Sequence, residues 1–182
     1  MELQTRSVRS PIGTLCLYAN GPALVALALA AGDGETRRWL RRRFGEFRAR
    51  PASDPAGTAS ALRAYFAGEL TALDRIEVDP GGTPFQRSVW SELRRIPPGT
   101  TLSYASLAAR VRRPKAMRAV GAANGSNPIP LVLPCHRVVS ADGTLCGYGG
   151  GLEAKRWLLI HEKALASGAW RVPLSPSQLP LL

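Results

Sequence analysis

The chain has 182 residues, of which 24 are Lys or Arg and 13 are Asp or Glu, so its net charge is +11. Its hydrophobic content of 45% is enough for a folded core. The first residues are polar and are interrupted by Arg6, Arg9 and Pro11, which argues against a signal peptide. The most apolar early run, 23–31, is too short to span a membrane, so we expect a cytoplasmic protein that does not contact one.

The excess of basic residues narrows the class of partner. A protein with an isoelectric point near 10.7 attracts polyanions, of which nucleic acid is the commonest. The alternative is a host proteome that is rich in arginine throughout. Charge alone does not decide between the two.

Three cysteines, Cys16, Cys135 and Cys146, form an odd set without paired spacing. This pattern argues against a disulfide framework and favours a reducing compartment, where a free thiol persists. Together with His136 and His161 they match no familiar zinc spacing, so we expect no metal site.

The first 30 residues predict a small meander of strands. The strand-like runs are 3–8, 13–19 and 23–30, and the dipeptide Asn20-Gly21 between the last two is a strong hairpin signal. A helix is expected over 35–44, with apolar side chains on one side and arginines around the rest. That arginine face either contacts DNA or is simply solvated, and we favour the solvated face. A second helix is expected over 59–67.

The breaker Asp79-Pro80-Gly81-Gly82 predicts a domain boundary. We therefore expect an N-terminal α/β domain over 1–81, a C-terminal domain over 82–171 and a frayed tail over 172–182. Strands followed by helices support the α/β class of the first domain only weakly.

Helical signals dominate after the boundary. Thr83 is a good N-cap with Pro84 at the first helical position, and Phe85, Val89 and Leu93 then give an apolar stripe. Two short helices over 103–110 and 113–125, joined by a tight turn, predict a helix-turn-helix. A final amphipathic helix is expected over 152–165.

The most informative segment is Pro134-Cys135-His136-Arg137, which follows the apolar run 129–133 that we interpret as a buried strand. The thiolate is the reactive form of cysteine, and a neighbouring imidazole and positive charge lower the pKa of a thiol. His136 and Arg137 therefore point to a nucleophilic Cys135. The alternative is that Cys135 is a small buried hydrophobic residue.

This segment and its surroundings resemble the O6-alkylguanine-DNA alkyltransferases, the methylated-DNA–protein-cysteine methyltransferases. The resemblance extends over nearly the whole C-terminal half, through the motifs Thr83-Pro84-Phe85-Gln86, Val89-Trp90, Ile96-Pro97-Pro98-Gly99, Ser103-Tyr104, Arg118-Ala119-Val120-Gly121, Asn127-Pro128, Gly150-Gly151-Leu152 and Trp157-Leu158-Leu159-Ile160-His161-Glu162. It implies an N-terminal domain of ribonuclease-H-like shape, with a small antiparallel sheet and helices. It also implies a mostly helical C-terminal domain whose helix-turn-helix is of the winged-helix type.

The resemblance implies a proton relay in which Glu162 orients His136, and His136 takes the proton of Cys135 through a water molecule. Asn127 corresponds to a hinge residue that ties the turn after the recognition helix to the active-site segment. Tyr148 corresponds to a loop tyrosine that polarises the guanine ring and helps it to leave. Alkyl transfer to Cys135 forms a thioether, so each molecule reacts once and needs no cofactor.

The second short helix has an unusual face for a DNA-binding helix. Arg118, Ala119, Ala122 and Ala123 share it by helical spacing, so it can approach a narrow surface closely but can read little sequence. The resemblance implies that this helix lies in the minor groove and that Arg118 enters the duplex where the damaged base has flipped out. Without the resemblance, we favour an alanine-rich core helix with one exposed arginine over a helix that binds DNA.

Further contacts to DNA and to the damaged base follow from the same resemblance. Tyr104, next to Ser103, corresponds to the tyrosine that presses on the 3′ phosphate and promotes base rotation; by itself it reads as core packing. Pro130 corresponds to a pocket wall, and the main-chain carbonyls of Cys135 and Val138 to acceptors of the guanine amino group.

Two departures from relatives predict a wider pocket. Gly149 stands where some relatives have a serine that binds O6, so its backbone N–H acts alone, and Asn124-Gly125 is smaller than its counterpart. A family zinc site in the N-terminal domain does not transfer, since this half has one cysteine and no histidine.

The implied function is stoichiometric repair of double-stranded DNA that carries O6-alkylguanine, and also O4-alkylthymine, by a monomer. The alternatives are a non-catalytic lesion-binding protein, which has tryptophan at the position of Cys135, a helix-turn-helix regulator, and a cysteine hydrolase. The sequence leaves open the preferred adduct, cooperative assembly on DNA, inducibility, and the roles of the arginine-rich helix, Cys16 and Cys146.

Overall fold

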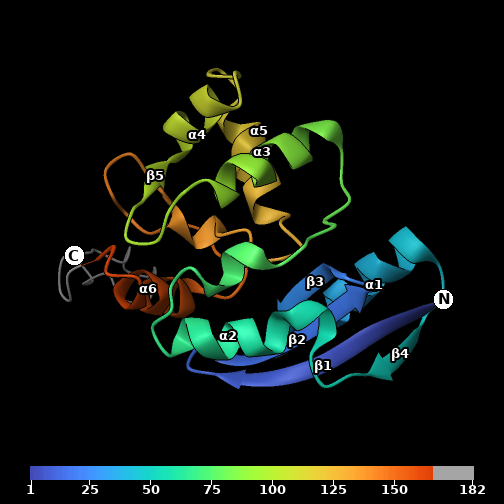
Figure 1. Ribbon diagram of the computed structural model, residues 1–182. Coiled ribbons are helices and arrows are strands. Elements are labelled where there is room, and N and C mark those ends of the chain that lie inside the picture. The colour runs from blue at the N-terminus through green and yellow to red at the C-terminus, as the bar shows by residue number, and fades with distance from the viewer. Residues whose placement is uncertain (166–182) are drawn as a thin grey trace, which may run out of the picture.

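The structure is a computed structural model that describes residues 1–165. Its N-terminal half contains a four-stranded sheet in the order β3-β2-β1-β4 (Figure 1). The strands are β1 (Glu2–Ser10), β2 (Gly13–Asn20), β3 (Ala23–Leu29) and β4 (Arg48–Pro51). The predicted meander is confirmed, since β1 pairs with β2 and β2 with β3, both antiparallel.

The fourth strand was not predicted. β4 pairs parallel with β1, so the sheet is mixed and not antiparallel throughout. All four residues of β4 are exposed, and the strand ends at Pro51. It therefore has neither the alternation nor the β-branched residues that reveal a strand in a sequence, which is typical of a short edge strand.

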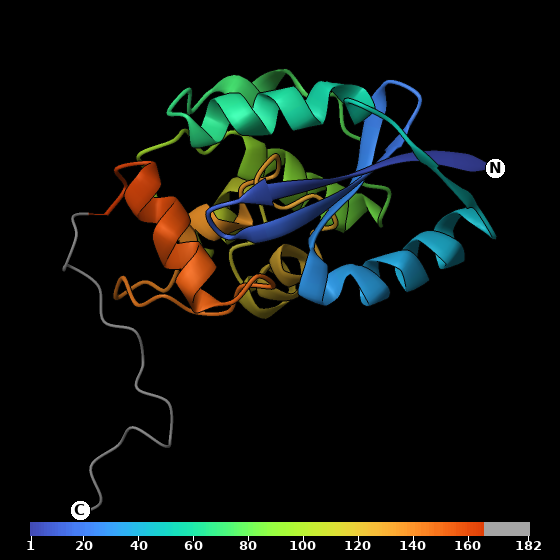
Figure 2. The ribbon, with the colours of Figure 1, turned by 90° about the horizontal axis from the view of Figure 1, so that it is seen from below.

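One helix covers each face of the sheet. Helix α1 (Asp33–Phe44) buries Leu40 with Leu3, Tyr18 and Val25 on one face. Helix α2 (Thr58–Phe66) packs into a second cluster on the other face, and Figure 2 shows the two helices at opposite sides of the strands. Alternation of side chains along the strands separates these two clusters.

Residues 82–165 contain four α-helices and a short parallel ladder. The helices are α3 (Pro84–Arg94), α4 (Tyr104–Arg110), α5 (Met117–Gly125) and α6 (Leu152–His161), and β5 (Leu102–Ser103) pairs with β6 (Val138–Val139). The predicted start of α3 is confirmed by a capping box: Gln86 N donates to Thr83 Oγ1 at 3.2 Å, and Thr83 N donates to Gln86 Oε1 at 2.9 Å. Trp90 of α3 donates its Nε1–H to the Ala123 carbonyl of α5 at 2.8 Å.

The segment before Cys135 is not the expected strand. Residues 129–133 form a buried turn in which Leu133 N donates to the Ile129 carbonyl and Leu131 has φ +70°. Prolines at 128, 130 and 134 remove the N–H groups that a sheet ladder needs, so the apolar run is buried by packing instead. Cys135–Arg137 then forms the 3-10 helix η4.

Two helix boundaries also differ from expectation. Helix α5 begins at Met117 and not at 113, because residues 113–116 form a separate turn in which Ala116 N donates to the Arg113 carbonyl at 2.8 Å. Helix α6 ends at His161, and the segment that follows passes through Lys163 with φ +59°. The tail expected over 172–182 lies outside the described residues.

The largest buried cluster contains residues from both halves of the chain. Leu24 and Leu27 of β3 share it with Val89 and Leu93 of α3, and Leu27 N donates to the Pro128 carbonyl at 2.9 Å. The hydrophobic packing is therefore continuous between the two halves of the chain. The domain boundary at residue 81 stays a prediction. No helix within residues 1–165 is long and apolar enough to cross a membrane.

Candidate active site

A cavity of about 480 Å³ opens between the two halves, and Cys135 is one of the residues that line it. Its other walls come from β3, the start of α1, α4, α5 and the loop over 147–150. Cys135 is only 6% exposed. A group that reacts with this thiol must therefore enter the cavity.

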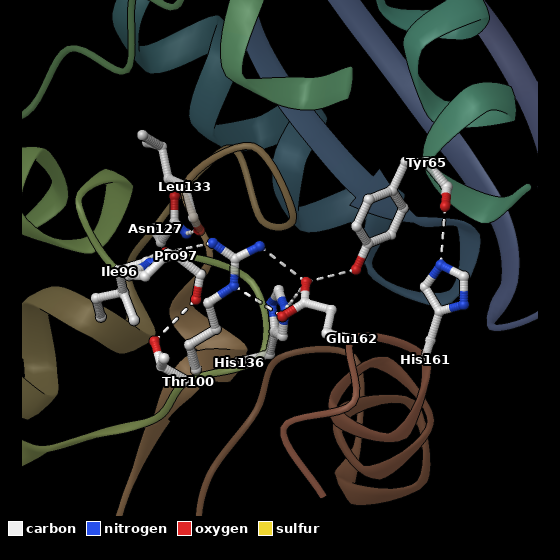
Figure 3. A network of polar contacts seen from close by, with 10 residues as sticks. Tyr65, Ile96, Pro97, Thr100, Asn127, Leu133, His136, His161 and Glu162 are labelled. Atoms are coloured by element: carbon white, nitrogen blue, oxygen red, sulfur yellow. Dashed lines mark hydrogen bonds and ion pairs between the residues drawn. The ribbon is translucent and has the colours of Figure 1, made fainter. Parts of the chain in front are cut away.

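Asn127 holds the turn that leads to Cys135. Its Nδ2 donates to the Leu133 carbonyl at 2.7 Å, and its Oδ1 accepts from Ile129 N at 2.9 Å. The Cys135 N–H donates to the same Leu133 carbonyl at 2.7 Å, so one acceptor links the hinge residue to the cysteine (Figure 3 shows Asn127 beside Leu133). This geometry fixes the thiol without a β-ladder.

The pKa of the Cys135 thiol is raised by burial. Asn127, the positive charge of Lys155 and backbone N–H groups act in the opposite direction. The expectation that the charge of Arg137 acts on the thiol is wrong, since the Arg137 side chain turns away to Glu162 and to the Ile96 carbonyl. The cation near the thiol is Lys155, twenty positions later in the chain.

Lys155 is fully buried and joins the segment of Cys135 to the loop that follows it. Its Nζ donates to the carbonyls of Val138 and Cys146, each at 2.7 Å. Burial lowers the pKa of this lysine. Its position on α6 gave no sequence signal, because a lysine on an amphipathic helix is usually exposed.

His136 and Glu162 form a buried pair, with Nε2 and Oε1 2.9 Å apart. Burial raises the pKa of Glu162, but hydrogen bonds from His136 and Arg137 outweigh it and hold the pKa well below the usual range. Burial lowers the pKa of His136, so the neutral imidazole is favoured. The carboxylate then accepts from Nε2–H, and Nδ1, which makes no hydrogen bond among the described residues, is left as the basic nitrogen.

Two further residues complete the surroundings of Glu162, and the sequence reasoning missed both roles. Arg137 donates through Nε to Oε2 and through Nη2 to Oε1, each at 2.8 Å. Tyr65, from α2, donates its hydroxyl to Oε1 at 2.7 Å, and Figure 3 shows it reaching Glu162 opposite His136. Arg137 lies within the recognised motif, whereas Tyr65 belongs to an apolar helix face and carried no signal.

Tyr148 lies close to this pair. Its ring centroid is 6.4 Å from that of His136, and its buried hydroxyl has no hydrogen-bond partner among the described residues. Burial raises the pKa of Tyr148, and the neighbouring Cys135 and Glu162 add to the effect, so the phenol keeps its proton. The phenol therefore remains a hydrogen-bond donor.

The predicted pocket residues divide into two groups. Pro130 and Gly149 line the cavity. Val138 is fully buried and is not among the lining residues, and its carbonyl already accepts from Lys155. The structure thus brings Cys135, Pro130, Tyr148 and Gly149 together around the cavity. Val138 does not reach the cavity.

The predicted DNA-contacting face of α5 is only partly exposed. Arg118, Ala119 and Ala122 are exposed, but Ala123 is 4% exposed and packs in the core beside Trp90. The prediction that Ala123 contacts DNA is therefore wrong. Arg118, Ala119 and Ala122 reach solvent, whereas Ala123 turns toward α3. Helical spacing defines which residues share a face, whereas the packing of α3 against α5 decides where that face meets the core.

Tyr104 and Ser103 lie at the start of α4. Tyr104 lines the cavity, and burial raises the pKa of its hydroxyl. Ser103 is the N-cap of α4, where its Oγ accepts from Ser106 N at 3.1 Å. Within residues 1–165, no group of three His, Cys, Asp or Glu side chains is arranged to hold a metal ion.

Comparison with known proteins identifies the family to which a chain with this site belongs. Residues 84–164 match the model of the 6-O-methylguanine DNA methyltransferase DNA-binding domain. A methylated-DNA–protein-cysteine methyltransferase of Salmonella typhimurium is 56% identical over 111 residues, which is 61% of this chain and 65% of that protein. The chain thus aligns with just under two thirds of the length of that relative.

Longer matches cover nearly the whole described chain. The methylated-DNA–protein-cysteine methyltransferase of Mycobacterium bovis is 45% identical over 164 residues, 88% of this chain and 93% of that protein. The crystal structure of Mycobacterium tuberculosis O6-methylguanine methyltransferase superposes with a TM-score of 0.74 at 40% identity, covering 90% of this chain and 94% of the other. A structure of the same mycobacterial protein in complex with DNA superposes with a TM-score of 0.75 at 42% identity and the same coverage. From the sequence match over nearly its whole length, this chain belongs to the methylated-DNA–protein-cysteine methyltransferase family.

Proposed function

We propose that this protein repairs DNA by direct reversal, moving the alkyl group of O6-alkylguanine irreversibly onto Cys135. The observation that carries the proposal is the Cys135 thiol lining a cavity next to the buried His136–Glu162 pair, in a chain of this family. The names of the relatives support the same reaction.

The transfer requires the thiolate of Cys135. In the proposed relay, the thiol proton passes through a water molecule to Nδ1 of His136, whose Nε2–H stays bonded to Glu162. The sulfur then attacks the alkyl carbon, the new S–C bond forms as the O6–C bond breaks, and the electron pair of that bond returns to the guanine. A thioether does not reverse under these conditions, so the protein is itself the acceptor and acts once.

The departing guanine needs a proton or a hydrogen bond at its ring. Tyr148 is suited to supply it, because its buried hydroxyl stays protonated and adjoins the cavity. We infer that the backbone N–H of Gly149, which lines the cavity from the same loop, binds O6.

Double-stranded DNA is the proposed partner. Because Cys135 lies inside a cavity, the damaged nucleotide must leave the base stack before it can react, which costs a few kcal/mol. We infer that α5 lies in the minor groove with Arg118 filling the position of the flipped base, and that Tyr104 and Ser103 act on the phosphate beside it. The exposed Arg118, Ala119 and Ala122 on α5 support this placement.

We also infer the finer features of the fold and state of this protein: a boundary at residue 81, a ribonuclease-H-like N-terminal domain, a winged-helix type of helix-turn-helix formed by α4 and α5, and a cytoplasmic monomer. The pairing of two short helices with the small β5–β6 ladder supports the third of these.

The test is the intact mass of the protein after incubation with a duplex that carries one O6-methylguanine. The proposal expects a gain of one methylene that stops at one per molecule and maps to Cys135 by peptide analysis, and no gain with Cys135→Ser. Unchanged mass with the lesioned duplex still bound preferentially would make the protein a lesion-binding protein instead. Methylation of another residue would refute the role of Cys135.

A further inference from the structure

The carboxylate of Glu162 accepts hydrogen bonds from His136 and Arg137, which lie beside Cys135 in the sequence, and from Tyr65, which lies in the N-terminal half. Its Oε1 accepts from three donors: His136 Nε2 at 2.9 Å, Arg137 Nη2 at 2.8 Å and the Tyr65 hydroxyl at 2.7 Å. Oε2 accepts from Arg137 Nε at 2.8 Å. Tyr65 lies 97 positions before Glu162 and is fully buried, so the contact depends wholly on the packing of α2 against α6.

The three donors compete for the charge of one oxygen atom. A hydrogen bond from Tyr65 stabilises the carboxylate and reduces the pull of Oε1 on the Nε2–H of His136. We propose that Tyr65 is a positioning residue of the proton relay: its hydroxyl fixes the Glu162 carboxylate and limits how strongly that carboxylate retains a proton on His136. This inference rests on the proposed function, in which His136 is the base for Cys135.

Tyr65 is itself held in place by residues of α2 and α6. Its carbonyl accepts from His161 Nε2 at 2.8 Å, and its ring meets the rings of His161 and Phe66 edge-on at 5.1 and 5.2 Å. Phe66 and His161 in turn contact Trp157 of α6. The hydroxyl is therefore presented to Glu162 by a packed aromatic group, as Figure 3 shows for Tyr65, His161 and Glu162.

Other charged and titratable groups also act on His136. Glu162 favours its protonated form, whereas Arg137 and Lys155 disfavour it, and Tyr148 packs edge-on against its ring. Of these, Glu162 makes the direct hydrogen bond, so a change at Tyr65 reaches His136 through Glu162. Removing the Tyr65 hydroxyl leaves this set otherwise intact.

The experiment measures the single-turnover rate of methyl transfer to Cys135 against pH, with a duplex that carries O6-methylguanine. Tyr65→Phe removes only the hydroxyl, and we expect the acidic limb of the profile to move upward by about half a pH unit, the size of one modest hydrogen bond. We expect the plateau rate to fall by about 3- to 10-fold as the carboxylate loses a fixed contact. Replacing Tyr65 with 3-fluorotyrosine, whose hydroxyl is a stronger donor, should move the limb in the opposite direction.

Tyr18→Phe is the matched control, because it also removes a tyrosine hydroxyl that donates to a carboxylate, Asp33 at 2.6 Å, and neither residue contacts Glu162 or lines the cavity. It should lower stability and leave the acidic limb in place. An unchanged limb in Tyr65→Phe, or equal effects of the two variants, would overturn the inference.

Titration of His136 by ¹⁵N NMR without DNA separates this inference from the proposed function. A midpoint that moves in Tyr65→Phe while the unmodified protein transfers no methyl group would support the coupling and refute the repair function. A His136 midpoint that is the same in Tyr65→Phe, together with normal methyl transfer by the unmodified protein, would refute the coupling and support the repair function.

Discussion

The ammonium group of Lys155 lies 2.7 Å from the carbonyl oxygen of Val138 and the same distance from that of Cys146, and the lysine is fully buried. This side chain therefore closes the segment 138–146 between the 3-10 helix of Cys135 and the loop of Tyr148. Replacement by Met keeps the volume but leaves two buried acceptors without a donor. We expect Lys155→Met to lower the free energy of unfolding by about 2–4 kcal/mol.

Urea denaturation with an unchanged m value is the measurement for Lys155→Met. Lys115→Met, at an exposed position, is the control and should stay within about 0.5 kcal/mol of the unmodified protein. Equal stability of the two variants would show that the buried ammonium group does not hold the loop.

Asn127 lowers the pKa of the Cys135 thiol, which burial raises. Asn127→Ala should therefore raise that pKa further and slow alkylation of Cys135 by iodoacetamide at neutral pH by about 3- to 10-fold, the effect of one hydrogen bond on the thiolate fraction. Peptide mapping of the same sample also gives the alkylation rate of Cys16 on β2, which is the internal control and should not change. A rate at Cys135 that does not change would separate Asn127 from the chemistry of the thiol.

Glu162 is the single carboxylate that faces Arg137 and His136 in the described network, so Glu162→Gln leaves a buried guanidinium without its counter-charge. We expect a loss of about 3–5 kcal/mol in the free energy of unfolding at neutral pH. The pKa of Glu162 in the folded protein is below its ordinary value of 4.5. Its stabilisation is therefore complete above pH 4.5 and is lost as the pH falls through the folded-state value.

The gap between the unmodified protein and Glu162→Gln should accordingly narrow in acid, which urea denaturation at a series of pH values measures. Glu46→Gln is the control, since Glu46 is exposed and lies 3.5 Å from Arg41 at the surface. Its effect should stay below about 0.5 kcal/mol. A constant gap for Glu162→Gln would mean that its carboxylate is not the group that titrates.

Arg118 is exposed on α5, so its replacement should not affect folding. We expect Arg118→Ala to reduce the salt slope of duplex binding by about 1 and to slow transfer from a duplex more than from a single strand. The reason is that only a duplex leaves a gap when the base flips out. Arg42→Ala, exposed on α1, is the control for charge alone, and a similar loss with both variants would remove the special role of Arg118.

The width of the cavity predicts acceptance of larger adducts. Gly125 and Gly149 line it, and a side chain at Gly125 would meet no atom within 4 Å of its Cβ. Gly125→Phe should therefore fold normally and lower the ratio of benzyl to methyl transfer by at least about tenfold. Taking the ratio within each protein cancels effects on DNA binding, and an unchanged ratio would refute the link between these glycines and adduct size.

Local interactions are what the sequence by itself determined. The hairpin at Asn20-Gly21 and the start of α3 at Thr83-Pro84 depend on residues within four positions of one another, and the structure confirms both. The adjacent Cys135 and His136, and the family motif around them, likewise lie in one short segment. Backbone preference and side-chain capping act between residues a few positions apart, so such features can be predicted from the sequence without knowledge of the fold.

Only the tertiary structure decided the remaining features. Strand β4 forms because the edge of β1 is free to pair with it. The segment 129–133 is buried but is not a strand, because three prolines remove backbone N–H groups that strand pairing requires. Tyr65 reaches Glu162 across 97 positions, and Arg137 pairs with Glu162 instead of facing the thiol. Burial cannot be inferred from residue type when a polar side chain finds its partner far along the chain, because the hydrogen bond that offsets its desolvation exists only after the chain has packed.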